Sequence, residues 1–200
     1  MEIIVIGATG TIGSEVARQL AAREHRVVHA SRGGEVKVDI DDPATIRAMF
    51  VKVTDADAVI CCAGNAAFRP FAALTDADYD LGLHSKLMGQ VALARIAKDR
   101  LRDRGSITLT AGVLATQPIP GSASISLVNA GVEGFTRAAA LEMPRGIRIN
   151  VVSPPWVAET LAKLHMHADV SLPALEVAKA YVAAVEGSQQ GTVLHPGRCG

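Results

Sequence analysis

The sequence predicts an α/β fold: a single domain over residues 1–200, with a doubly wound parallel sheet of about seven strands and helices on both faces. Three observations predict it. Apolar, β-branched runs of strand length alternate with longer segments of helical periodicity. A glycine-rich turn joins the first strand directly to the first helix. No repeat, low-complexity tract or linker interrupts the 200 residues, a length that suits one core.

The first strand, turn and helix form a unit that predicts an anion site. Residues 3–6 are all β-branched and apolar, which indicates a buried strand. Residues 7–13 read G-A-T-G-T-I-G, and a helix with an apolar stripe follows. Such glycines let the backbone approach a pyrophosphate, which then faces the open amides of the helix N-terminus. The spacing differs from the usual G-x-G-x-x-G, so a turn with incidental glycines stays an alternative.

The next elements are short. A second strand is expected at residues 26–30, and the alternation over 35–40 predicts a short third strand. The gap between them is too short for a crossover helix. Asp42 as N-cap and Pro43 at the first helical position begin a helix that runs to about Phe50.

The remaining elements continue the alternation of strands and helices. Strands are expected at residues 57–64, 105–110, 147–152 and 192–195, and helices at 74–101, 122–143 and 173–186. Ligands of such a sheet bind at the carboxyl ends of the strands, where the strand order switches. The polar and glycine motifs of the chain follow strand ends in this way, at Gly7, Ser31, Ala63, Thr110 and Pro154.

Arg32 indicates which dinucleotide would bind. An acidic residue at the end of the second strand would bond a ribose 2′-hydroxyl, whereas an arginine accommodates a 2′-phosphate. This sequence has Ser31 and Arg32 there and no acid. We therefore expect NADP(H) as the cofactor, with a solvated turn arginine as the alternative.

Composition and charge exclude other classes. Twenty Lys and Arg balance 20 Asp and Glu, so no general attraction to nucleic acid or an anionic membrane is expected. No apolar run reaches membrane-spanning length, and the first strand begins too early for a signal peptide to precede it. Cys61, Cys62 and Cys199 give neither metal spacing nor an even set, and His165 and His167 lack a third ligand nearby. We expect no metal and a cytoplasmic location.

Four stretches resemble the short-chain dehydrogenase/reductase family over essentially the full chain. Residues 7–13 look like its glycine turn, and Asp39 with Ile40 looks like its adenine contact. Residues 61–64 look like its Asn-Asn-Ala-Gly segment with only Ala63 and Gly64 retained. Residues 150–157 with Thr160 are similar to its segment that holds the nicotinamide carboxamide, where Pro155 replaces the usual glycine.

The resemblance implies a Rossmann-type fold and a full NADP(H) site. The cofactor-binding residues implied by the family motifs and by Arg32 are Gly7, Thr9, Gly10, Thr11, Ile12, Gly13, Ser31, Arg32, Asp39, Ile40, Ala63, Gly64, Lys86, Thr110, Pro154, Pro155, Trp156, Val157 and Thr160.

The catalytic centre departs from the family pattern. The family uses Tyr-x-x-x-Lys on the second long helix, with a Ser ahead of it and an Asn on the first long helix. Aligned on residues 130–134, Ile125 stands at the Tyr position and Asn129 at the Lys position. Neither Tyr79 nor Tyr181 has a lysine four residues on. Losing a positioned acid or base typically costs about 10²–10⁴ in rate.

Lys86 stands where the family's Asn is expected, so the Lys and Asn are exchanged. We hypothesise that Lys86 bonds the nicotinamide ribose or polarises a substrate carbonyl, with Thr110 or Ser126 as a supporting hydroxyl. His84 is a further acid candidate, although two positions from Lys86 it lies on a different helix face. A solvated helix lysine is the alternative for Lys86.

The sequence therefore predicts an NADP(H)-dependent oxidoreductase that acts on a small-molecule carbonyl or alcohol with a non-standard active site. A catalytically inactive NADP(H)-binding regulatory or scaffold protein is the alternative. The resemblance also implies a homodimer or tetramer built on the two long helices. Their apolar stripes could equally bury against the sheet.

Overall fold

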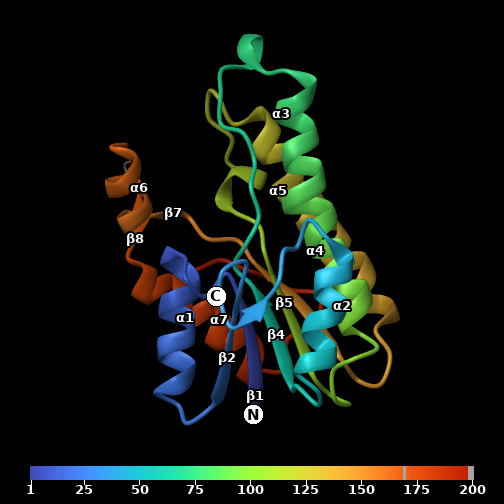
Figure 1. Cartoon of the computed structure of the whole chain (residues 1–200). Helices are drawn as coiled ribbons and strands as arrows, with labels where there is room; N and C mark the ends of the chain where they lie inside the picture. Colours follow the sequence, from blue (N-terminus) through green and yellow to red (C-terminus); the bar gives the residue numbers. More distant parts are fainter. Residues whose placement is uncertain (169, 198–200) are drawn as a thin grey trace.

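The computed structural model of the chain describes residues 1–168 and 170–197. Within them, seven parallel strands form one sheet in the order β3-β2-β1-β4-β5-β6-β9 (Figure 1). The strands are β1 (Glu2–Ile6), β2 (Arg26–Ser31), β3 (Val36–Lys37), β4 (Ala58–Cys61), β5 (Ser106–Thr110), β6 (Arg148–Val152) and β9 (Val193–Leu194). The order reverses between β1 and β4, and a crevice for ligand is expected at the carboxyl ends there.

The pleat of the central strand β1 divides the core between the two faces of the sheet. Ile3 and Val5 pack with one cluster of buried residues, and Ile4 and Ile6 pack with the other. Strands buried on both faces read as continuous apolar runs, which explains residues 3–6. The first face is covered by α1 (Thr11–Ala21) and α7 (Ala174–Glu186), and the second by α2 (Pro43–Lys52), α4 (Gln90–Ala97) and α5 (Ala123–Ala139). The predicted doubly wound α/β fold is confirmed.

A small second sheet lies in the segment that follows β6. It consists of β7 (Trp156–Val157) and β8 (Ser171–Leu172), with α6 (Ala158–Leu164) between them. Figure 1 shows this segment beside the beginning of α1. The described residues also contain three short 3₁₀ turns: η1 (Phe71–Ala73), η3 (Val113–Ala115) and η4 (Ala140–Glu142). Among the described residues, no helix combines the length and apolarity that crossing a bilayer requires.

The long helix expected at residues 74–101 is divided into three parts. It consists of α3 (Asp76–Leu81), a π-helical segment η2 (Gly82–Gly89) and α4. The two glycines that bound η2 lie against other elements. A Cβ on Gly89 would approach the Ile40 carbonyl oxygen to 2.9 Å, and one on Gly82 would approach Val128 to 3.2 Å. The wider π turn thus lets this segment pass close to Ile40, which follows β3, and to α5, which apolar periodicity alone does not reveal.

Other boundaries also differ from the expected ones. The third strand is limited to Val36–Lys37, because the chain then turns at Asp39 toward α2. The helix expected at 122–143 ends as an α-helix at Ala139 and continues as the turn η4.

Gln90, the first residue of α4, bonds the backbone of β5 at the point where β5 no longer pairs with β4. Its side-chain carbonyl oxygen accepts a hydrogen bond from the Thr110 N–H (2.8 Å). Its amide nitrogen donates to the Thr110 carbonyl oxygen (2.9 Å). The register of β4 with β5 ends at Ile60 and Thr108, so Gln90 replaces a strand neighbour beyond that point. The two strands can therefore separate where a ligand would enter.

We expect Gln90→Leu to lower the free energy of unfolding by about 2–4 kcal/mol, because two buried backbone groups of Thr110 lose their partners. Urea denaturation measures this difference. Gln117→Leu is the matched control, because Gln117 is exposed and should change stability little. Equal effects of the two substitutions would contradict this role of Gln90.

Candidate functional site

The glycine turn between β1 and α1 leaves no room for larger residues. Gly7 has a φ of +80°, a backbone conformation that residues other than glycine rarely adopt. A Cβ at this position would approach the Cys62 carbonyl oxygen to 2.9 Å. A Cβ on Gly13 would collide with the Gly7 carbonyl oxygen. Gly10 caps α1 without a side-chain hydrogen bond, and no acidic residue lies in the first turn. The turn therefore offers open amides at the positive end of a helix, which favours an anion.

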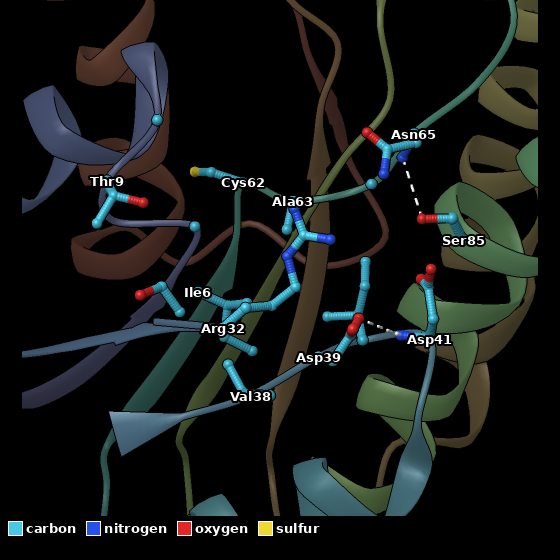
Figure 2. A pocket seen from close by; sticks show the side chains of 15 residues that line it. Ile6, Thr9, Arg32, Val38, Asp39, Asp41, Cys62, Ala63, Asn65 and Ser85 are labelled. Carbon is cyan, nitrogen blue, oxygen red and sulfur yellow. Dashed lines mark hydrogen bonds between the residues drawn. The ribbon is translucent and has the colours of Figure 1, made fainter. Parts of the chain in front are cut away.

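A first cavity of about 320 Å³ opens beside this turn, at the carboxyl ends of β1, β2 and β4. Figure 2 shows Arg32 extending from the end of β2, between Thr9 of the glycine turn and Asp39. Among the described residues, no carboxylate forms an ion pair with Arg32. The cavity thus holds a guanidinium that is available for an anionic ligand group.

Asp39 is held firmly in the first cavity. Its N–H donates to the Thr45 hydroxyl (2.9 Å), and that hydroxyl donates back to the Asp39 carbonyl oxygen (2.7 Å). Its carboxylate accepts a hydrogen bond from the Asp41 N–H (3.2 Å; Figure 2). Asp41 also lines the cavity, and its Oδ1 is buried without a partner among the described residues. This lone acceptor is suited to a ligand N–H or O–H group.

A second cavity of about 250 Å³ adjoins the first, and the two share Cys62, Ala63 and Gly64 as lining residues. It lies between the carboxyl ends of β4, β5 and β6 and contains Lys86 from η2 and Asn129 from α5. Ile125 lines the same cavity one helical turn before Asn129. The two cavities therefore form one extended cleft along the strand ends.

The structure brings most of the predicted cofactor residues into this cleft. The first cavity contains Gly7, Thr9, Gly10, Ser31, Arg32, Asp39, Ile40, Ala63 and Gly64. The second contains Ile12, Ala63, Gly64, Lys86, Thr110, Pro154, Pro155, Trp156, Val157 and Thr160. Thr11 and Gly13 do not line either cavity. Gly13 packs against the turn instead, and the Thr11 hydroxyl accepts a hydrogen bond from Lys163.

Lys86 is half-buried and lines the second cavity. The residue keeps some accessible surface, but burial lowers the pKa of its ammonium, and the neighbouring Cys61 and Cys62 only partly oppose that effect. Among the described residues, no carboxylate pairs with it. A lysine with a lowered pKa is a better proton donor than a solvated one.

Asn129 lines the second cavity together with Lys86. Its side chain is only 2% exposed, and its Oδ1 has no hydrogen-bond partner among the described residues. A buried amide oxygen without a partner costs free energy, which a ligand hydroxyl could recover. The predicted exchange thus delivers one ammonium and one amide to one cavity.

The other predicted hydroxyls are occupied elsewhere. The Thr110 hydroxyl donates to the Cys61 carbonyl oxygen and shares a hydrogen bond with the Tyr181 hydroxyl (2.8 Å). Burial raises the pKa of Tyr181 well above its usual value and that of Cys61 to about 11, so neither gives up its proton readily. The Ser126 hydroxyl donates to the Ser122 hydroxyl (3.0 Å), and Ser126 does not line the cavity.

His84 does not lie in the cleft with Lys86, and the described residues include no candidate metal-binding group. The His84 ring bonds the Asp41 carbonyl oxygen (3.1 Å), and His84 does not line either cavity of the cleft. No group of three or more His, Cys, Asp or Glu side chains that could hold a metal occurs among residues 1–168 and 170–197. Cys199 lies outside the described residues.

A third cavity of about 700 Å³ borders the second, and the two share Val113, Leu114, Pro155 and Trp156. Its other lining residues are mostly apolar and include Ile119 and Met166. Trp156 also makes an edge-to-face contact with Phe68, with ring centroids 6.0 Å apart. An apolar molecule could therefore lie beside the second cavity.

Three polar residues that line the first cavity, Asp41, Asn65 and Ser85, were not among the predicted site residues. Asp41 and Ser85 line it, and the Ser85 hydroxyl accepts a hydrogen bond from the N–H of Asn65 (3.1 Å; Figure 2). Asn65 directly follows the recognisable Ala63 and Gly64, so its position could have been inferred. Ser85 has no such signal, because the π turn of η2 decides where it points.

Known proteins resemble the chain in sequence and structure. A family model described as enoyl-(acyl carrier protein) reductase matches residues 7–179. The crystal structure of the protein lin1944 from Listeria innocua is 39% identical, covers 98% of both chains and has a TM-score of 0.93. The crystal structure of a small-chain dehydrogenase in complex with NADPH is 27% identical and has a TM-score of 0.86, covering 98% of this chain and 95% of that one. Hydroxynaphthalene reductase-like protein Arp2 of Metarhizium brunneum (strain ARSEF 3297) is 29% identical over 179 residues, which are 77% of this chain and 67% of that protein.

We expect Lys86→Met to raise the melting temperature, because it removes a half-buried cation that pairs with no carboxylate among the described residues, while keeping the apolar stem. Each kcal/mol gained corresponds to about 2–4 °C for a chain of this size. Burial lowers the pKa in the folded state, so the gain is full below the folded-state pKa and fades as pH rises from there to the unfolded value of about 10.4. Calorimetry over this pH range measures it.

The exposed Lys37 supplies the control for this measurement. Lys37→Met should leave the melting temperature nearly unchanged. If Lys86→Met behaves in the same way, Lys86 is a solvated helix lysine.

Proposed function

The chain belongs to the short-chain dehydrogenase/reductase family of nicotinamide-dependent oxidoreductases, and on that premise we propose that it transfers hydride between NADP(H) and a carbonyl or alcohol substrate. The observation that carries this proposal is the continuity of the cleft. Its two cavities join through Cys62, Ala63 and Gly64, with Arg32 in one and Lys86 with Asn129 in the other.

The residues of the cleft fit a dinucleotide. The glycine turn forms a cradle that a Cβ would fill, and Asp41 and Asn129 each present a buried acceptor without a partner. Asp39 and Asp41 suit the adenosine end, and Pro154 to Thr160 would lie along the nicotinamide end. Arg32 forms no ion pair with a carboxylate among the described residues, so it suits a 2′-phosphate. The sequence has no acidic residue at the end of β2 that could bond a ribose 2′-hydroxyl.

The bound nicotinamide would supply the hydride. Lys86 would donate an N–H to the substrate carbonyl oxygen, stabilise the negative charge that develops there and give up its proton to form the alcohol. Asn129 Oδ1 would accept a hydrogen bond from a ribose hydroxyl and so hold the ring in place. Thr110, whose hydroxyl already bonds Cys61 and Tyr181, would support the end of β5.

A second function rests on Ile125. An isoleucine side chain lines the cavity where the family's catalytic tyrosine would stand, and it can neither donate nor accept a proton. Binding of NADP(H) by a regulatory or scaffold protein without turnover remains the competing proposal. A panel of carbonyl compounds with NADPH, followed by its absorbance, together with calorimetric binding distinguishes the two. Binding without any turnover favours the second function.

Substrate and assembly belong to the same proposal. A carbonyl compound with an apolar body would occupy the third cavity, beside Leu114, Trp156 and Met166. A homodimer or tetramer through the α4 and α5 region and a cytoplasmic location are carried forward from the family resemblance.

We expect Arg32→Ala to weaken NADPH binding by about 10- to 100-fold, because a charged hydrogen bond contributes about 1.5–3 kcal/mol. Binding of NADH should change little. Isothermal titration with both cofactors measures the preference. Arg100→Ala is the control, because Arg100 is exposed and its side chain makes no hydrogen bond among the described residues. A preference for NADPH that survives in Arg32→Ala would refute the assignment of Arg32.

We expect Lys86→Met to reduce carbonyl reduction by about 10²–10⁴, because the proton donor is lost. In the wild type, reduction should fall as pH rises through the Lys86 pKa, which burial places below the usual lysine value, since only the ammonium donates a proton. Steady-state kinetics from neutral to alkaline pH measure both effects. A Lys86→Met enzyme with an unchanged rate and pH profile would exclude Lys86 as the donor.

A further inference from the structure

Lys163 of α6 contacts the beginning of α1 in an electrostatically unfavourable position. Its Nζ donates a hydrogen bond to the Thr11 hydroxyl (2.9 Å), and Thr11 is the first residue of α1. The N-terminus of a helix carries a partial positive charge, so a cation beside it is destabilising unless an anion lies between them. The first turn of α1 contains no acidic residue that could serve.

Other carboxylates do not neutralise Lys163 either. Among the described residues, none forms an ion pair with it. Glu159, one helical turn earlier on α6, instead accepts a hydrogen bond from the Ala174 N–H at the start of α7 (2.9 Å). The Lys163 ammonium and the open amides of α1 are therefore two positive groups that an anion between them would stabilise.

The position of α6 connects Lys163 with the cleft. Thr160 lines the second cavity, and Lys163 lies three residues later, on the same face of the helix. Figure 1 shows α6 beside the beginning of α1. Glu159 links α6 to α7, and Lys163, one helical turn later, links α6 to α1. A ligand anion at the glycine turn would lie within the reach of a side chain that already spans this gap.

We propose that Lys163 binds the pyrophosphate of the cofactor and thereby fastens α6 over the occupied cleft. The inference rests on the proposed function for the identity of the ligand and adds a positioning residue to it. Arg32 and Lys163 then divide the recognition of charge: Arg32 bonds the 2′-phosphate, which only NADP(H) carries, and Lys163 bonds the pyrophosphate, which NADP(H) and NAD(H) share. Lys163 consequently contributes affinity without contributing to the choice between the two cofactors.

Two fragments of the cofactor separate these roles. ADP-ribose contains the pyrophosphate and lacks the 2′-phosphate, whereas 2′-AMP contains the 2′-phosphate and lacks the pyrophosphate. Calorimetric titration of the full chain gives the dissociation constants of both fragments and of NADPH. We expect Lys163→Met to weaken ADP-ribose and NADPH by about tenfold or more and to leave 2′-AMP unchanged, because one charged hydrogen bond is lost. Arg32→Ala should weaken 2′-AMP and leave ADP-ribose unchanged.

Two variants control for the charge and the fold. Lys163→Arg keeps the cation and should retain most of the affinity for ADP-ribose. Lys179→Met removes an exposed lysine of α7 that pairs with Glu176, and it should change none of the dissociation constants. Trp156 is the one tryptophan of the sequence and adjoins α6, so its fluorescence should change on NADPH binding in the wild type and change less in Lys163→Met.

The outcomes also separate this inference from the proposed function. A wild type that binds NADPH, together with a Lys163→Met variant of equal affinity for ADP-ribose, overturns the role of Lys163 alone. Equal weakening of 2′-AMP and ADP-ribose in Lys163→Met overturns it as well, because the effect is then not confined to the pyrophosphate. A folded wild type that binds neither NADPH nor NADH overturns the inference and the proposed function together.

Discussion

The close approach of three backbone segments at the glycine turn is the constraint on which the site depends. The Gly7 N–H donates to the Ala30 carbonyl oxygen of β2 (2.9 Å), and the Cys62 N–H donates to the Ile6 carbonyl oxygen of β1 (2.8 Å). With Gly13 packed against Gly7, these contacts join β1, β2, β4 and the start of α1 without intervening side chains. Both cavities of the cleft share walls formed at this junction, so a larger residue at Gly7 or Gly13 would displace all of them.

The site lowers the stability of the fold that carries it. Lys86 keeps an ammonium in surroundings that disfavour charge, and Asn129 and Asp41 bury oxygen atoms without partners among the described residues. These three groups line the cleft, although Thr108, Glu133 and Ser153 also bury oxygen atoms without partners elsewhere among the described residues. Gln90 compensates nearby, because it satisfies the backbone of Thr110 where the sheet opens. Polar groups without partners in the cleft, beside a backbone whose hydrogen bonds are complete, are expected of a functional site.

The parts of the fold that follow from local patterns could be predicted from the sequence. The apolar run at residues 3–6, the glycines after it and the Asp42 cap each depend on neighbours in the chain, and the structure has them where the patterns indicate. The π turn of η2 could not be predicted, because packing of Gly82 and Gly89 against other elements decides it. The same limit applies to Asp41 and Lys163. Nothing near them in the sequence shows that the first lines a cavity and the second reaches α1.

The shared cavity of Lys86 and Asn129 restricts how this centre could change by single substitutions. The sequence predicts that the two residue types are exchanged relative to the family pattern. On that prediction, changing either one alone to the family's residue gives two ammoniums or two amides in the cavity that both line. Two buried cations would repel each other, and two amides would leave the site without a charge. The two positions are therefore coupled, and only a paired change keeps one of each. A change to the family's usual arrangement in two single steps would therefore pass through a variant whose cavity holds two cations or none.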